Sequence, residues 1–233
     1  DEIMRVLAPG GTAYVLHDGT WEKTVRPWPE EMDTWTHLLH GADNNAVAQD
    51  SMVGPPRRLR WKSEPTWCRS HEFISSFVSM VSDNGRIFFV FDEGLTGVTD
   101  PSIPERWTLI ARDAFSGVLL WKRPMKEWNT VNFRGSGRGF VPPPINRTLI
   151  ADGDHLFTVS SFRGAVVKLE GATGSEIQQY AKTEGTEEMI LCDNTLLVRT
   201  SARDSDGQNA LVALNPDTGE ILWERPEEGY LAE

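Results

Sequence analysis

Short apolar runs that end at polar turns recur along the chain, and this pattern predicts β-strands. In the clearest copy, an apolar run enters a turn bounded by Asp113 and Gly117, and a second apolar run leaves it and ends at Trp121. Two further copies follow later in the chain, the first of them weaker. The three copies span residues 110–121, 166–178 and 211–223. The sequence therefore contains three copies of one strand–turn–strand unit.

A second kind of polar turn precedes another set of apolar runs. These turns lie at residues 83–85, 152–154 and 193–194. Each pairs with a later glycine turn, at Gly117, Gly174 and Gly219. The repeat formed by each pair of turns recurs at roughly the 40–50 residues typical of propeller blades. A loop at residues 131–147 lengthens the first interval. We therefore predict an all-β fold, a partial β-propeller of about three four-stranded blades in residues 72–233.

The start of the chain has a different pattern. Apolar residues at helical spacing, from Ile3 to Leu7, predict a short helix that ends at a Pro-Gly-Gly sequence, and residues 12–16 have strand character. Residues 1–16 are thus expected to be a short α/β remnant. Residues 17–71 are rich in tryptophan and proline, which predicts a connector with short elements.

Within this connector, residues 57–62 alternate basic with apolar side chains. Leu59 and Trp61 are expected to face inward on a strand while the arginines face outward. A basic patch for nucleic acid is the alternative, but the chain is acidic overall. Its 233 residues carry a net charge of −11, which argues against a protein whose main task is to bind nucleic acid or an anionic membrane.

Hydrophobic residues make up 39% of the chain, enough for a sizeable core, and nine residues are tryptophan. No run approaches the roughly 18 apolar residues of a membrane-spanning helix, so no membrane span is expected. The two cysteines, Cys68 and Cys192, have no metal-type spacing. Whether they pair is left open.

Three polar residues of the connector are candidates for a ligand or partner site. His37 and His40 would share one face of a helix, and Asp43 follows them, so the three offer metal-ligand chemistry. The alternative is a polar turn that ties the connector to the next domain.

A second candidate group is Arg69, His71 and Glu72. Together with Ser70 they place a base, a hydroxyl and an acid close in sequence. Adjacent residues on a strand point to opposite faces, however, so Ser70 and His71 do not readily form a catalytic dyad. We assign no catalytic or metal residue, and we expect Asp92 and Glu93 to lie in a solvated loop.

The repeat resembles the blades of the pyrroloquinoline-quinone (PQQ) type β-propeller family, which includes the outer-membrane assembly lipoprotein propeller. The family motif is A-x-D-x-x-T-G-x-x-x-W, and the residues that match it are Ala111, Asp113, Gly117 and Trp121 in one copy and Ala213, Asn215, Thr218, Gly219 and Trp223 in another. The middle copy departs, with Lys168 at the Ala position and Gln178 at the Trp position, which puts its docking contact in doubt. The resemblance implies that the tryptophans pack between neighbouring blades.

A wider resemblance covers most of residues 3–125. The Pro-Gly-Gly corner is similar to one near the end of class I S-adenosylmethionine-dependent methyltransferases, so residues 1–16 resemble the C-terminal remnant of such a domain. A planctomycete-type subgroup joins a methyltransferase-like part to a propeller of this kind. This resemblance implies a cell-envelope location and names no biochemical activity.

The resemblance does not by itself imply a cofactor. Family enzymes hold the quinone on the axis of a complete ring, with residues from many blades, a calcium ion and often an adjacent cysteine pair. We therefore expect no cofactor in residues 1–233, and PQQ only in a complete ring.

An open arc of blades exposes strand edges, a liability that propellers avoid by radial repetition. We expect this chain to be a fragment of an incomplete ring, with the remaining blades of the parent chain as its first partner. The leading hypothesis is a non-catalytic propeller for binding or scaffolding, with a protein or a carbohydrate as ligand. The alternative is part of a quinone- or metal-dependent oxidoreductase.

Overall fold

The computed structural model describes residues 2–52, 54, 58–68, 75–97, 103–128, 145–201 and 209–227. The first elements along the chain are the helix α1 (Glu2–Val6) and the strands β1 (Thr12–His17) and β2 (Thr20–Val25). The first large sheet contains β3 (Phe77–Asp83), β4 (Arg86–Asp92), β5 (Trp107–Asp113) and β6 (Leu119–Pro124). The second sheet follows the short helix η1 (Ile145–Arg147) and contains β7 (Ile150–Asp152), β8 (His155–Val159), β9 (Val166–Glu170) and β10 (Glu176–Gln179). The third contains β11 (Thr186–Cys192), β12 (Thr195–Thr200), β13 (Ala210–Leu214) and β14 (Ile221–Pro226).

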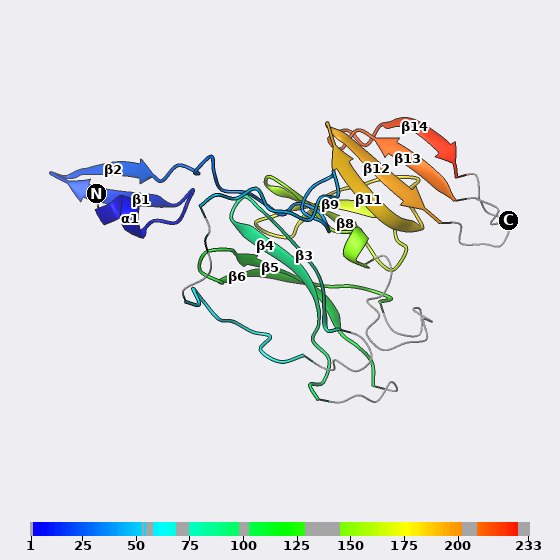
Figure 1. The fold of residues 1–233 in the computed structure, drawn as a ribbon, viewed down its shortest axis with the longest axis horizontal. Helices are drawn as coiled ribbons and strands as arrows, with labels where there is room; N and C mark the ends of the chain where they lie inside the picture. Colours follow the sequence, from blue (N-terminus) through cyan, green and yellow to red (C-terminus); the bar gives the residue numbers. More distant parts are fainter. Residues whose placement is uncertain are drawn as a thin grey trace.

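The three sheets are the predicted blades. In each, four antiparallel strands lie in sequence order. The first strand of the middle blade, β7, contacts the first strands of both other blades, β3 and β11. The later strands of each blade extend away from this centre, as Figure 1 shows. The prediction of an all-β, propeller-like fold with about three four-stranded blades is confirmed for the described residues.

Local turn chemistry sets the strand boundaries. The β3–β4 turn places Asn84 and Gly85 at φ angles of 41° and 73°, and the β11–β12 turn places Asp193 and Asn194 at 46° and 56°. Two consecutive positive φ values match the twist of a two-residue hairpin, and Asn, Asp and Gly tolerate them best. These are the polar turns that the sequence predicted before each second strand.

Apolar side chains from facing blades form the core. One buried cluster joins Val81 and Phe88 of the first blade to Leu156 and Leu169 of the second. A second cluster continues from the second blade to the third, where it includes Leu196 and Leu214. The propeller is therefore held together by blade-to-blade packing.

The helix α1 and the β1–β2 hairpin form a separate small unit, seen at one end of the molecule in Figure 1. Most side chains of this hairpin are exposed. Trp28 links the unit to the first blade, because its ring packs on Gly10 on one side and lies near Gly85 and Phe115 on the other. None of the helices among the described residues is long and apolar enough to cross a membrane.

Candidate functional site

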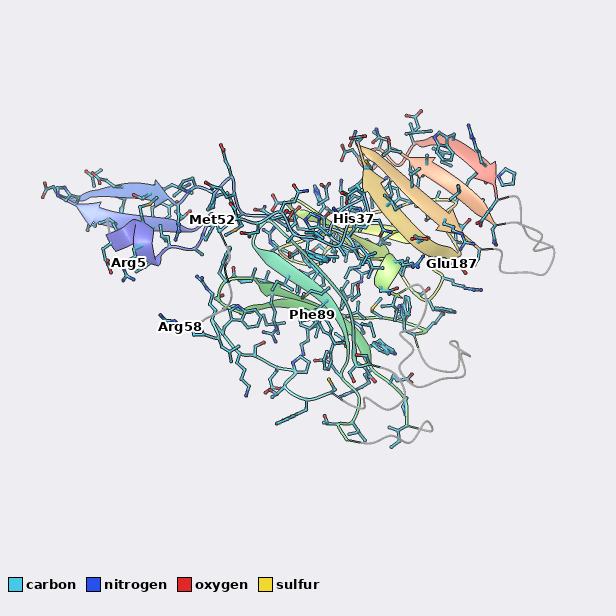
Figure 2. All side chains as sticks on the ribbon, viewed as in Figure 1. Arg5, His37, Met52, Arg58, Phe89 and Glu187 are labelled. Atoms are coloured by element: carbon cyan, nitrogen blue, oxygen red, sulfur yellow. The ribbon has the colours of Figure 1, made fainter. Side chains whose placement is uncertain are left out.

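Three consecutive connector residues reach the first strands of all three blades. Each bonds to the same position of a blade, the residue before the last of its first strand. The pairs are Trp35 with Ser82, Thr36 with Ala151 and His37 with Leu191. We call residues 35–37 the hub. Figure 2 shows His37 in the crowded region where the blades meet.

The hydrogen bonds of the hub are regular. Trp35 and Ser82 exchange both backbone N–H groups, with donor–acceptor distances of 3.1 and 2.7 Å. The N–H of Ala151 donates to the carbonyl of Thr36 over 3.0 Å, and the N–H of Leu191 donates to His37 Nε2 over 3.1 Å. The connector thus satisfies backbone groups that would otherwise end unpaired at the inner edge of each blade.

His37 is held as a neutral imidazole. Its side chain is buried, and this burial lowers its pKa below the ordinary value. The negative charges of Asp152 and Asp43 act to raise the pKa, but burial has the larger effect. Nε2 accepts the Leu191 N–H, so the proton belongs on Nδ1, which lies 2.8 Å from Thr36 Oγ1. Both ring nitrogens are therefore committed to the fold.

His40 is committed to a different partner. Its Nε2 lies 2.6 Å from Asp33 Oδ2, which also accepts the backbone N–H of Gln49 at 2.6 Å. Partial burial opposes the charge of Asp33, but the hydrogen bonds from Gln49, Thr34 and His40 outweigh it and lower its pKa. This pair closes the loop between the hub and residue 49.

His37 of the predicted ligand group is itself a hub residue, and it forms an isolated β-bridge with His40, so the expectation that the two share a helix face is wrong. Asp43 follows them in the same connector loop. Within the described part of the chain, no three His, Cys, Asp or Glu side chains are arranged to hold a metal ion. Arg69, His71 and Glu72 lie outside the described residues. A ligand or partner role for these six residues stays a prediction. Sequence reasoning did not find Thr36, because it joins the middle blade through its backbone carbonyl, which no side-chain motif could have indicated.

A hollow of about 550 Å³ opens where β4 ends and β5 begins. The residues that line it are Pro65, Trp67, Phe91, Asp92, Glu93, Gly94, Thr96, Glu105, Arg106, Trp107, Thr108, Pro124 and Met125. Asp92, expected in a solvated loop, is instead buried, and its Oδ1 accepts the backbone N–H groups of Gly94 and Arg106. Glu93 pairs with Lys122. The hollow has the size of a small-molecule site, with aromatic walls and carboxylates.

The motif tryptophan docks one blade on the next. The indole N–H of Trp121, in β6, donates to the carbonyl of Gly171 in the second blade over 2.9 Å. Its ring lies on Gly174, where an added Cβ would meet Trp121 at 2.6 Å. Gly174 has a φ of 71°, so both the turn and the close approach require glycine. The structural role implied by the motif is present at this junction.

The middle copy achieves the same docking with other side chains. Gln178 lies against Gly219 of the third blade, as Trp121 lies against Gly174. The Tyr180 hydroxyl donates to the carbonyl of Pro216 over 2.5 Å, and Lys168 Nζ donates to the same oxygen over 3.3 Å. Pro216 stands at the turn position that Gly171 occupies one blade earlier. The departures from the motif thus change the docking residues and keep the docking contact.

Comparisons with known proteins give a family and a fold. The family model described as outer membrane protein assembly factor BamB matches residues 105–232. No curated protein matches the chain in a comparison by sequence.

Among solved structures, the chain is similar to a europium-containing methanol dehydrogenase, with 15% identity, a TM-score of 0.54, and coverage of 84% of this chain and 32% of that one. It also matches a quinohemoprotein alcohol dehydrogenase from Comamonas testosteroni, with 14% identity, a TM-score of 0.46, and coverage of 67% of this chain and 22% of that one. BamB from Moraxella catarrhalis matches with 15% identity, a TM-score of 0.27, and coverage of 66% and 62%. The chain spans about a third of the methanol dehydrogenase, whose likeness supports the propeller fold alone.

Proposed function

Because the chain belongs to the outer membrane protein assembly factor BamB family, we propose that it serves as a non-catalytic β-propeller module that binds or scaffolds other molecules. The observation that carries this proposal is how the chemically capable side chains are used. Both ring nitrogens of His37 bond within the fold, His40 pairs with Asp33, and Lys168 bonds to the third blade. These three side chains are used for packing and for joining the blades, which favours a binding module over a catalyst that would use them as acids or bases.

We also propose that further blades complete a ring with these three. Trp223 stands where Trp121 stands two blades earlier, yet its side chain is 40% exposed, against 9% for Trp121. Leu222 beside it is 49% exposed. An additional blade would cover this outer face as the second blade covers Trp121. A cell-envelope location and a methyltransferase-like origin of residues 1–16 belong to the same proposal.

The ligand of such a scaffold would be a protein or a carbohydrate. The hollow beside Trp67 supports this, because an exposed aromatic face next to carboxylates and Arg106 can contact polar surfaces. Trp67 is 74% exposed at its rim.

An oxidoreductase that holds a quinone through a metal ion is the competing function. Such a site needs several carboxylate or other oxygen ligands around one cation. The described residues do not fit this requirement, since no three His, Cys, Asp or Glu side chains among them converge. We therefore derive no reaction step through a quinone.

Quinone and metal content of the complete polypeptide tests the proposal. The purified protein would be incubated with PQQ and with Ca²⁺ or a lanthanide, dialysed, and measured by absorbance and elemental analysis. We expect binding well below one equivalent of each. Stoichiometric quinone with a metal ion would overturn the scaffold function and make the ring axis a catalytic site.

A further inference from the structure

We propose that the hollow where β4 ends and β5 begins binds an uncharged pyranose unit of a glycan, with the sugar ring stacked on Trp67. The inference rests on the binding function proposed above and names the chemical class of the ligand at this hollow. The volume of about 550 Å³ lies within the range of about 300–1,000 Å³ that is typical of small-molecule sites. A short glycan fits such a space, whereas a protein domain does not.

The first argument is the aromatic surface at the rim of the hollow. The Trp67 side chain is 74% exposed, whereas Trp107, which also lines the hollow, is 3% exposed and belongs to the core between the first two blades. Trp67 also stands outside the motif positions, which Trp121 and Trp223 occupy. An indole is a flat apolar surface, so it stacks on the C–H face of a pyranose and leaves the sugar hydroxyls to contact polar groups.

The second argument is a polar shelf formed by Asp92, Glu93 and Arg106. The backbone N–H of Glu93 donates to the carbonyl of Arg106 over 3.0 Å, and the Arg106 guanidinium donates to the carbonyl of Glu93 through two of its nitrogen atoms. Asp92 Oδ1 accepts the N–H groups of Gly94 and Arg106 at 2.9 and 2.8 Å. Because these bonds order the shelf before a ligand arrives, binding does not carry the entropic cost of fixing its side chains.

The third argument is the hydrogen-bonding capacity that the polar shelf keeps. Lys122 pairs with one oxygen of the Glu93 carboxylate, and a carboxylate offers about four acceptor sites. The Arg106 guanidinium likewise has more N–H groups than its bonds to the Glu93 carbonyl use. Hydroxyls on adjacent carbon atoms of a pyranose both donate and accept, so one sugar ring bonds to a carboxylate and a guanidinium together.

The fourth argument is charge, which selects the kind of sugar. The ionisable residues that line the hollow in the described part of the chain are Asp92, Glu93, Glu105 and Arg106, so acidic groups outnumber basic ones. A uronic acid, a sulfated sugar or a phosphorylated sugar would be repelled. An organic cation gains little, because Asp92 already accepts backbone N–H groups and Glu93 is already paired with Lys122. The hollow therefore favours an uncharged sugar.

Calorimetric titration of the complete polypeptide with defined glycans tests this assignment. The neutral probes are cellohexaose, chitohexaose, maltohexaose and xylohexaose, and the acidic counterpart is a hexamer of galacturonic acid. We expect at least one neutral hexaose to bind saturably, with a Kd of about 0.1–1 mM, and the acidic hexamer to bind at least about tenfold more weakly. Tighter binding of the acidic hexamer, or no saturable binding of any neutral hexaose up to about 5 mM, would overturn the proposal.

A matched pair of tryptophan variants locates the binding site. Trp67→Ala removes the stacking surface and should weaken binding of the neutral hexaose at least about tenfold. Trp21→Ala is the control, because the Trp21 side chain is 65% exposed on the β1–β2 hairpin, and it should change the Kd less than about twofold. Equal effects of the two variants, or unchanged binding in Trp67→Ala, would place the glycan elsewhere and overturn the assignment.

This test and the test of the scaffold function fail separately. A complete polypeptide with little quinone, little metal and no bound glycan would keep the scaffold function and lose this inference. Stoichiometric quinone with a metal ion would overturn the scaffold function, whatever the glycan titration gives.

Discussion

Asp113 and Asn215 occupy the same position in the turns of the first and third blades and do the same work there. Asp113 Oδ1 accepts the backbone N–H groups of Phe115 and Ser116 at 3.1 and 2.7 Å. Asn215 Oδ1 accepts the N–H groups two and three residues ahead at 2.9 and 3.0 Å. The turn needs a short side chain with an acceptor oxygen, and it is indifferent to the charge.

The charge of Asp113 nevertheless makes the stability of the folded protein depend on pH. Partial burial opposes ionisation, but hydrogen bonds from Ser116 and from two backbone N–H groups lower its pKa below the ordinary value. A lowered folded-state pKa contributes stability above the unfolded pKa of about 4, and that stability is lost as the pH falls through the folded value. Asp113→Asn should therefore approach the wild type in stability between pH 5 and pH 2.

Urea unfolding at a series of pH values measures this effect. Asp113→Ala is the companion variant and should lose about 1 kcal/mol at pH 7, because it leaves the turn N–H groups without an acceptor. A constant difference between wild type and Asp113→Asn at every pH would refute the assigned shift.

Trp121 should be among the most costly side chains to truncate. It is 9% exposed, packs on Gly174 and donates to the carbonyl of Gly171. We expect Trp121→Ala to lower the free energy of unfolding by about 3–5 kcal/mol. Trp67→Ala, at a side chain that is 74% exposed, should cost less than about 0.5 kcal/mol. Similar losses for both variants in urea unfolding would contradict the docking role.

At the level of whole strands, the pairing between the third and fourth strands of each blade explains why the middle blade departs from the motif. Directly paired residues of the third and fourth strands are Ala111 with Trp121 in the first blade, Lys168 with Gln178 in the second, and Ala213 with Trp223 in the third. A small residue faces the large indole, and a long residue faces the smaller amide. The two departures are one compensated change across a strand pair.

Strand boundaries and turns could be predicted because their causes are local. Asn84 with Gly85, and Asp113 with Gly117, lie within a few residues of the strands they join, so a short window of sequence contains the signal. The substitution of Tyr180 for a docking indole could not be predicted, because the bond to Pro216 spans 36 positions and depends on how two blades meet.

A double-mutant cycle tests the compensation. Gln178→Trp alone should lower the free energy of unfolding by about 1–3 kcal/mol, because the indole would crowd the buried Lys168. Adding Lys168→Ala recreates the Ala–Trp pair of the first blade. The double variant should therefore be at least about 1 kcal/mol more stable than the sum of the single effects.

The control for this cycle pairs Gln178→Trp with Lys122→Ala, a change on the first blade. These two effects should add within about 0.5 kcal/mol, since the residues share no strand pair. Additivity in the test pair as well, measured by urea unfolding, would show that Lys168 and Gln178 do not compensate each other.

At the scale of the whole molecule, a short connector segment forms hydrogen bonds with three blades. The hub residues Trp35, Thr36 and His37 bond one blade each, in chain order, at equivalent backbone positions. The blades could be predicted from repeats, but the hub could not, because the bond from Leu191 to His37 spans 154 positions and two of its three contacts involve only backbone. His37 was singled out for metal chemistry, and the structure shows it in use as a buried acceptor.

This use of His37 makes the attachment of the third blade sensitive to pH. Burial lowers the pKa of His37 despite the nearby Asp152 and Asp43. The stability contributed by the neutral ring is complete above the unfolded pKa of about 6.5 and is lost as the pH falls through the lower folded value. Protonated Nε2 cannot accept the Leu191 N–H, so acid should weaken this junction first.

Two substitutions separate the acceptor from its titration. His37→Gln places an amide oxygen near the position of Nε2, so it should stay within about 1 kcal/mol of the wild type at pH 7.5 and gain on it as the pH falls to 5. His37→Leu removes the acceptor and should cost about 1–3 kcal/mol at pH 7.5. The free energies of unfolding of wild type and His37→Gln could instead differ by the same amount from pH 7.5 to pH 5. In that case the third blade is held by its packing against the second, and the bond from Leu191 to His37 contributes little to its attachment.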